Sequence, residues 1–185
     1  FHLFFFIILI KLKKLYLKHM SDILNAIGNT PIVKLKNIVP IGCGEIYVKL
    51  EAFNPTGSKK DRMALSMISG AEKRGVLKKG MTVVEYSGGS TGAGLAFVCS
   101  LKGYNFRLVT ADVFGKEKID LMRSLGANLE IIKSPDGKIN KELITKMIKK
   151  ADQISKEPNT FFTNQLNNTD VIEGFIPLGE EILNQ

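Results

Sequence analysis

The chain of 185 residues is poor in histidine and in cysteine, with two residues of each. His2 and His19 precede the part of the sequence in which helix and strand patterns begin, so we expect neither to act as a catalyst or a metal ligand. Cys43 and Cys99 stand in no Cys-x-x-Cys or zinc-binding pattern, which excludes a recognisable metal site or disulfide framework. Unpaired thiols fit a reducing compartment, and we therefore expect a cytoplasmic protein.

The sequence also lacks a hydrophobic run long enough to cross a membrane. Its strongest apolar stretch, residues 3–10, has eight residues, whereas a helix needs about 20 to span a bilayer. The basic residues follow this stretch, while a secretory signal would place them before it. We expect translation to start at Met20 and residues 1–19 to be upstream sequence outside the native domain. A membrane-surface anchor is the alternative, and a membrane partner is the less favoured reading.

A net charge of +8 raises the question of nucleic-acid binding. Residues 1–19 carry four lysines and no acidic residue, so they account for about half of this excess. The lysines of segment 141–150 fall on the polar side of a predicted helix, and no aromatic residues are interleaved with them. The pattern predicts solvated helix faces and no nucleic-acid partner.

Strand and helix patterns alternate along most of the chain. Apolar segments predict strands at 46–50, 81–86, 104–110 and 129–132, and helical spacing predicts helices at 116–125, 140–155 and 171–183. No internal repeat or low-complexity linker interrupts the series. This alternation is typical of an α/β fold with mainly parallel twisted sheets flanked by helices.

The junction between a predicted strand and a predicted helix near residue 60 carries the first candidate chemical group. Residues 54–58 form a turn signal in which Ser58 is suited to cap the following helix. Lys60 would lie in the first turn of that helix, where the partial positive charge of the helix end disfavours a second cation. A lysine with a lowered pKa is nucleophilic and can form a Schiff base with a carbonyl. For an arbitrary surface helix, a solvated Lys59–Lys60 pair is the alternative.

A glycine-rich run between a predicted strand and helix is the second candidate site. It consists of Ser87, Gly88, Gly89, Ser90, Thr91 and Gly92. Its N–H groups would converge at a helix N-terminus, a geometry that holds anions. No Gly-Lys-Ser/Thr follows it as in a Walker loop, and its glycine spacing differs from the dinucleotide fingerprint. A plain glycine-rich connector is the alternative.

Several separated motifs resemble the β-family of pyridoxal phosphate (PLP)-dependent enzymes, also called fold type II. This family includes cysteine synthase, cystathionine β-synthase, serine and threonine dehydratases and the tryptophan synthase β chain. Residues 54–62 match its pattern Asn-Pro-x-x-Ser-x-Lys-Asp-Arg, with Lys60 at the lysine position. Segments 27–35, 71–85 and 125–129 also resemble family segments, in the same order. The resemblance runs from about Ser21 to the end and implies a tryptophan synthase β-like fold.

The resemblance also assigns roles to the candidate residues. It implies that Lys60 binds PLP as a Schiff base. The glycine-rich run corresponds to the family's Thr-Ser-Gly-Asn-Thr-Gly loop, which holds the substrate carboxylate. Ser90 replaces an asparagine that contacts the cofactor ring in the family, so Ser90 is our second candidate cofactor contact. Gln165, in segment 161–169, resembles a glutamine that completes the carboxylate site; a polar loop is the alternative. The expected substrate-binding residues are Ser87, Gly88, Gly89, Ser90, Thr91 and Gln165.

The activity implied by the resemblance is PLP-dependent β-elimination followed by β-replacement on an activated serine. Formation of cysteine from O-acetylserine and sulfide is the cysteine synthase form of this reaction. A PLP-dependent serine or threonine ammonia-lyase is the alternative within enzymes, because the two reactions differ only in their late steps. A truncated member without catalytic activity is the alternative from another class.

Chain length bears on the expected organisation. Members of the resembled family have roughly twice this length, so we expect an N-terminal portion that is incomplete at the C-terminus and inactive alone. Residues 20–62 and 164–185 would form part of the PLP-binding domain, and residues 63–163 a smaller α/β domain with the carboxylate loop. The glycine-rich loop for the PLP phosphate would lie in the absent part. A homodimer that binds a small amino acid is expected at full length.

Overall fold

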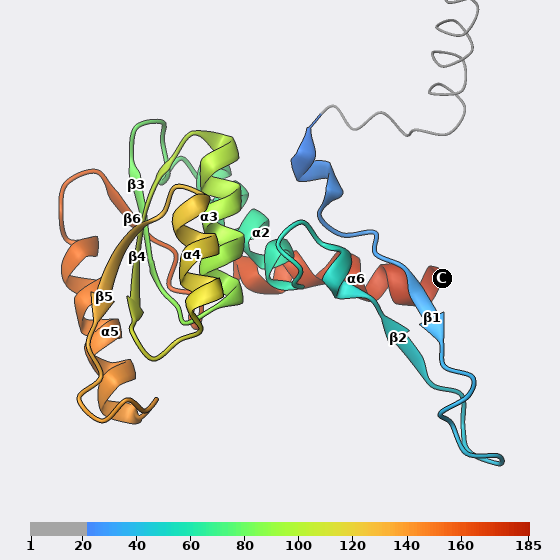
Figure 1. The fold of residues 1–185 in the computed structure, drawn as a ribbon. Helices are drawn as coiled ribbons and strands as arrows, with labels where there is room; N and C mark the ends of the chain where they lie inside the picture. The colour runs from blue at the N-terminus through green and yellow to red at the C-terminus, as the bar shows by residue number, and fades with distance from the viewer. Residues whose placement is uncertain (1–21) are drawn as a thin grey trace, which may run out of the picture.

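The computed structural model describes residues 22–185, so the predictions for residues 1–19 and for Met20 lie outside the described part. A four-stranded sheet with the order β5-β4-β3-β6 forms its centre (Figure 1). The strands are β3 (Thr82–Tyr86), β4 (Asn105–Ala111), β5 (Asn128–Ile132) and β6 (Thr160–Phe162). All three neighbouring pairs are parallel, as the sequence pattern predicts.

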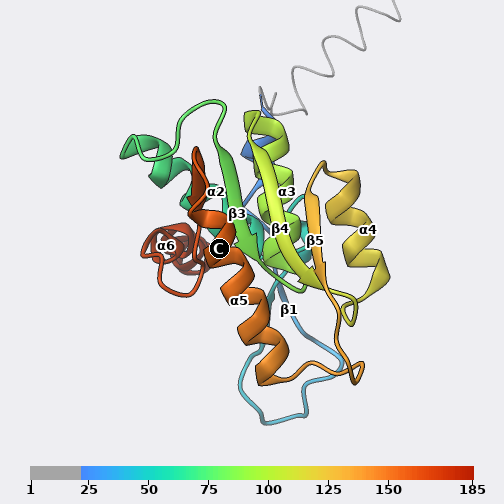
Figure 2. The same cartoon turned by 90° about the vertical axis from the view of Figure 1, so that its left-hand side faces the viewer.

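Helices cover both faces of this sheet (Figure 2). One face packs against α3 (Ser90–Lys102) and α4 (Lys116–Ser124), with α2 (Lys60–Lys73) packed on α3, and the other face packs against α5 (Lys141–Ser155). Because successive strand residues point to opposite faces, Val83 belongs to the first core cluster and Val84 to the second. Both side chains are fully buried, as is usual in a parallel sheet with two covered faces.

A separate antiparallel hairpin lies apart from the main sheet. It is formed by β1 (Ile32–Lys34) and β2 (Tyr47–Lys49), next to the short 3-10 helices η1 (Ile23–Ala26) and η2 (Glu51–Phe53). Figure 1 shows the hairpin extending away from the sheet, beside the C-terminal half of α6 (Asp170–Asn184). Tyr47 and Val48 are 52% and 37% exposed, so both faces of β2 are open and not half-buried as its alternating pattern suggests.

The predicted strands and helices agree with the structure to within a few residues at their ends, and the structure adds β1, β6, η1 and η2. Strand β6 was not predicted, because residues 160–162 precede an Asn-rich segment that has the composition of a loop. None of the helices in residues 22–185 is both long and apolar enough to cross a membrane. The same part of the chain holds no group of three or more His, Cys, Asp or Glu side chains placed to bind a metal ion.

Candidate functional site

The candidate residues gather at the carboxyl edge of the sheet. The glycine-rich run follows β3, and Gln165 follows β6. Because β3 and β6 are parallel neighbours, their carboxyl ends meet at one edge, where open α/β sheets commonly bind ligands. Lys60 begins α2, and its carbonyl oxygen lies 3.2 Å from the position that a Cβ on Gly94 of α3 would take. The start of α2 therefore packs one turn beyond the glycine-rich run.

Lys60 is half-buried at the first position of α2. Its N–H donates to the Ser58 Oγ at 3.2 Å. Ser58 was expected to cap this helix, but the N-cap residue is Lys59, which makes no side-chain capping bond. Burial, followed by repulsion from Lys59, lowers the pKa of Lys60. The Lys59 amine lies over the Phe175 ring, 6.0 Å from its centroid. The pKa of Lys60 is thus lowered, as predicted from the sequence, with burial as the first cause.

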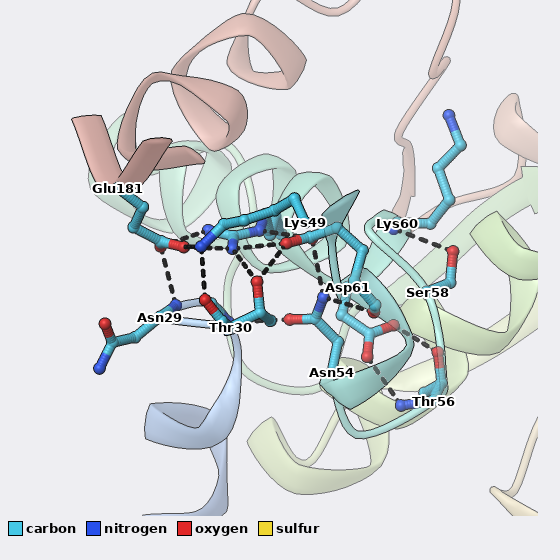
Figure 3. A network of polar contacts seen from close by, with 12 residues as sticks. Asn29, Thr30, Lys49, Asn54, Thr56, Ser58, Lys60, Asp61 and Glu181 are labelled. Carbon is cyan, nitrogen blue, oxygen red and sulfur yellow. Dashed lines mark hydrogen bonds and ion pairs between the residues drawn. The ribbon is translucent and has the colours of Figure 1, made fainter. Parts of the chain in front are cut away.

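Asp61 fixes the turn that presents Lys60. Its buried carboxylate accepts the Thr56 N–H at 2.7 Å and also accepts the Thr56 hydroxyl. Burial raises the pKa of Asp61, and the bonds from Thr56 partly offset that rise. Figure 3 shows Lys60 extending away from this polar network, while Asp61 points into it. The neighbouring carboxylate thus holds the backbone and leaves the Lys60 amine outside the network.

Arg62 anchors the same segment to distant parts of the chain. Its side chain is 3% exposed and donates to both oxygens of Glu51 and both oxygens of Glu181. Lys49 also pairs with Glu181 at 2.7 Å. Asn54 accepts the Gly28 N–H at 2.8 Å and so joins the network from the turn. Arg62 and Asn54 thus tie the segments that follow and precede Lys60 to α6 and to the turn at Gly28.

The glycine-rich run is held by its own first residue. Ser87 Oγ accepts the N–H groups of Gly89 and Gly92, each at 3.1 Å. Two of the amides predicted to face an anion are thus already used. Within residues 22–185, the N–H groups of Ser90 and Thr91 have no acceptor, and Gly89 supplies no side-chain cap. The capacity to bind an anion at this helix end rests on those two groups.

Gln165 contacts the strand that leads into the glycine-rich run. Its side-chain amide donates to the Tyr86 carbonyl at 2.9 Å, directly before Ser87. Its backbone N–H donates to Glu85 at 2.9 Å, and the Thr163 hydroxyl donates to the same carboxylate at 2.8 Å. Glu85 is fully buried, and burial raises its pKa. Sequence reasoning missed Glu85, although an acidic residue within the apolar run of β3 was a visible signal.

Two cavities lie along α2 and α6 and away from this edge. One of about 260 Å³ is lined in part by Ile27, Leu65 and Pro177, and another of about 570 Å³ by Lys73, Arg74 and Asp170. Neither is lined by Lys60, by the glycine-rich run or by Gln165. The glycine-rich run and Gln165 thus lie at one edge of the sheet, the start of α2 lies beside Gly94, and none of these residues lines either cavity.

The family relationship follows from comparison with known proteins. The family model described as "Pyridoxal-phosphate dependent enzyme" matches residues 23–185. This chain belongs to that family. Cysteine synthase of Staphylococcus aureus is 41% identical over 151 residues, which cover 82% of this chain and 47% of the relative. A probable cysteine synthase of Bacillus subtilis is 39% identical over 154 residues, covering 83% and 48%. The chain thus spans about half the length of the curated relatives it matches.

Solved structures of family members share the fold. A hydrogen sulfide-producing enzyme of Fusobacterium nucleatum superposes with a TM-score of 0.82 at 36% identity, covering 91% of this chain and 54% of that protein. O-acetylserine sulfhydrylase isoform 3 of Entamoeba histolytica gives a TM-score of 0.80 at 32% identity, covering 91% and 50%. These matches confirm the family and the α/β fold class predicted from the sequence.

Proposed function

We propose that this chain supplies the cofactor lysine and the substrate-carboxylate loop of a PLP-dependent enzyme of the cysteine synthase type. Its substrates would be an activated serine such as O-acetylserine, with sulfide as the incoming nucleophile. The observation that carries the proposal is the half-buried Lys60, which has a lowered pKa and whose helix starts beside Gly94, in the helix that follows the glycine-rich run. Such an amine fits covalent attachment of an aldehyde cofactor.

Each site residue has a distinct proposed role. PLP, when bound, supplies an electron sink for bond breaking at the substrate Cα. Lys60 holds the cofactor and moves the proton at that carbon. The N–H groups of Ser90 and Thr91 bind the substrate carboxylate, and the hydroxyl of Ser87 can donate to it. Gln165 supplements this site, and the Ser90 hydroxyl is the second contact with the cofactor.

The remaining roles concern the backbone and the assembly. Gly88 and Gly89 form the backbone of the carboxylate loop before Ser90, where a Cβ would meet Phe114 and Lys118. Residues 20–62 and 164–185 belong to a PLP-binding domain, and residues 63–163 to the smaller domain with the carboxylate loop.

The longer enzyme is a cytoplasmic homodimer. Light scattering on a longer protein that contains this chain tests the dimer, and a monomer at micromolar concentration contradicts it.

Reductive trapping tests the role of Lys60. The chain is incubated with PLP and then reduced with sodium borohydride, and the modified peptide is mapped by mass spectrometry. We expect the adduct on Lys60, its loss in Lys60→Ala and its retention in the matched control Lys59→Ala. An adduct that persists at full yield in Lys60→Ala contradicts the assignment.

The product separates the proposed reaction from its alternative. With O-acetylserine and sulfide, the longer enzyme is expected to form cysteine. Release of a 2-oxo acid from serine or threonine, without cysteine formation, would instead identify an ammonia-lyase. Omitting sulfide is the control, because only β-replacement requires the second substrate.

A further inference from the structure

The ring of Phe114 lies directly against the backbone of Gly88. A Cβ built on Gly88 would stand 2.2 Å from the Cε1 atom of Phe114 and 2.4 Å from its Cζ atom. Atoms at such distances overlap, so a side chain at position 88 and the observed ring position exclude one another. The ring therefore occupies the volume next to the second residue of the glycine-rich run.

Strand order explains why these two residues meet. Phe114 follows β4, and its N–H donates to the Ala111 carbonyl at 3.3 Å in a tight turn. Since β4 pairs with β3, the turn after β4 lies beside the run after β3. The ring also packs against the core cluster under α5, which contains Tyr86 and Leu143. It is thus supported by the core on one side and meets Gly88 on the other.

Lys118, in the first turn of α4, covers the glycine-rich run next to the Phe114 ring. A Cβ on Gly89 would lie 3.3 Å from the Lys118 Cδ atom, so the methylene chain of Lys118 covers Gly89. Both glycines before Ser90 are therefore covered by side chains that follow β4. The run is closed on this side, and the Ser90 and Thr91 N–H groups come next along the chain.

We propose that Phe114 is a specificity-determining residue of the carboxylate site. This inference rests on the proposed role of the glycine-rich run. The ring fills the space that a side chain or several water molecules would otherwise take beside Gly88. Exclusion of water strengthens hydrogen bonds from the Ser90 and Thr91 N–H groups to a carboxylate. An apolar ring beside the glycine-rich run should therefore favour ligands that offer a free carboxylate to these N–H groups.

Two titrations test the carboxylate role. The ¹⁵N-labelled chain is titrated with L-serine and, as a matched ligand without a carboxylate, with L-serinamide. We expect the Ser90 and Thr91 amide signals to shift with L-serine only. Phe114→Ala should weaken L-serine binding by roughly three- to tenfold, the range of one well-made hydrogen bond. Phe97→Ala is the control, since it removes a half-buried ring of α3 that packs in the other core cluster.

The outcomes separate this inference from the proposed function. If L-serine does not shift Ser90 or Thr91 in the parent chain, the carboxylate role of the run is overturned and this inference falls with it. If L-serine binds the parent and Phe114→Ala equally well, the role of the run stands and the inference is overturned. Weakening by Phe114→Ala and not by Phe97→Ala supports it.

A double-mutant cycle tests the contact itself without any ligand. Gly88→Ala should lower the thermal midpoint of the parent by several degrees, about the shift that 1 kcal/mol produces in a domain of this size. In the Phe114→Ala background, the same change should have little effect, because the obstructing ring is gone. Equal effects of Gly88→Ala in the two backgrounds would show that the ring does not occupy this space, and would overturn the inference.

Discussion

Arg62 and Glu181 lie 119 positions apart in the chain and form a two-pronged ion pair, with both Nη–Oε distances at 2.7 Å. Arg62 stands two residues after Lys60, and Glu181 lies near the C-terminal end of α6. Guanidinium and carboxylate groups in this planar arrangement form strong, directional bonds. The pair therefore ties the segment that presents Lys60 to the last helix of the chain.

Removing Arg62 should be strongly destabilising. Arg62→Ala leaves the carboxylates of Glu51 and Glu181 close together without their buried partner, and we expect a loss of about 3–5 kcal/mol in the free energy of unfolding. Urea unfolding followed by circular dichroism measures this loss. Arg123→Ala is the control: its side chain is 57% exposed, and its pair with Asp120 should contribute at most about 1 kcal/mol. Equal losses in the two variants would contradict the structural role of Arg62.

The same pair predicts a specific sensitivity to acid. Hydrogen bonds from Arg62 hold the pKa of Glu181 down to about 2, against 4.5 for an ordinary glutamate. The unfolded chain thus takes up a proton at Glu181 before the folded chain does. The stability from Glu181 is present above about pH 5 and is lost as the pH falls from there towards 2.

Glu181→Gln should therefore flatten the decline in unfolding free energy between pH 5 and pH 3. The exposed neighbour Glu180 provides the matched control Glu180→Gln. Urea unfolding at each pH is the measurement. Parallel pH profiles for the two variants would show that the ion pair of Glu181 does not govern acid stability.

Two glycines of α6 provide a matched test of how this helix packs. A Cβ on Gly174 would lie 2.9 Å from the Arg62 carbonyl oxygen and 3.0 Å from the Met63 Cα, whereas a Cβ on Gly179 would meet nothing within 4 Å. Gly179→Ala should stabilise the chain by about 0.5–1 kcal/mol through helix propensity. Gly174→Ala should destabilise it by about 1–3 kcal/mol, because backbone atoms of α2 must shift. Unfolding curves that rank Gly174→Ala above the parent would contradict the close contact.

The parts of this fold that were predictable are those with local signals. Lys60 could be placed at a helix start because the turn, Ser58 and the apolar spacing all lie within a few residues of it. Strand β6 could not be found in this way, since its three residues form a strand only because they pair with β3. The ion pair of Arg62 with Glu181 and the contact of Phe114 with Gly88 likewise depend on distant segments meeting. Motif order identified the family because it needs no knowledge of such contacts.

Glu85 should hold the Gln165 segment against β3. Glu85→Ala removes the acceptor of the Thr163 hydroxyl and of the Gln165 N–H, and we expect a loss of about 1–3 kcal/mol in stability. Hydrogen exchange of the Gln165 backbone N–H should then become faster than exchange through global unfolding alone. The control Glu142→Ala changes an exposed glutamate of α5 and should leave that amide unaffected. Unchanged exchange in Glu85→Ala would show that other contacts fix the segment.

The reactivity of Lys60 should depend on its neighbour. Burial lowers the pKa of Lys60 most, and the charge of Lys59 lowers it further. Lys59→Met removes that repulsion, so the pKa of Lys60 should rise and its neutral fraction at a given pH should fall. Competitive labelling with acetic anhydride across a pH series, read by mass spectrometry, gives the pKa of Lys60 without any cofactor. The exposed Lys79 supplies the control Lys79→Met. If Lys59→Met leaves the midpoint of Lys60 labelling unchanged, burial alone sets the reactivity of this amine.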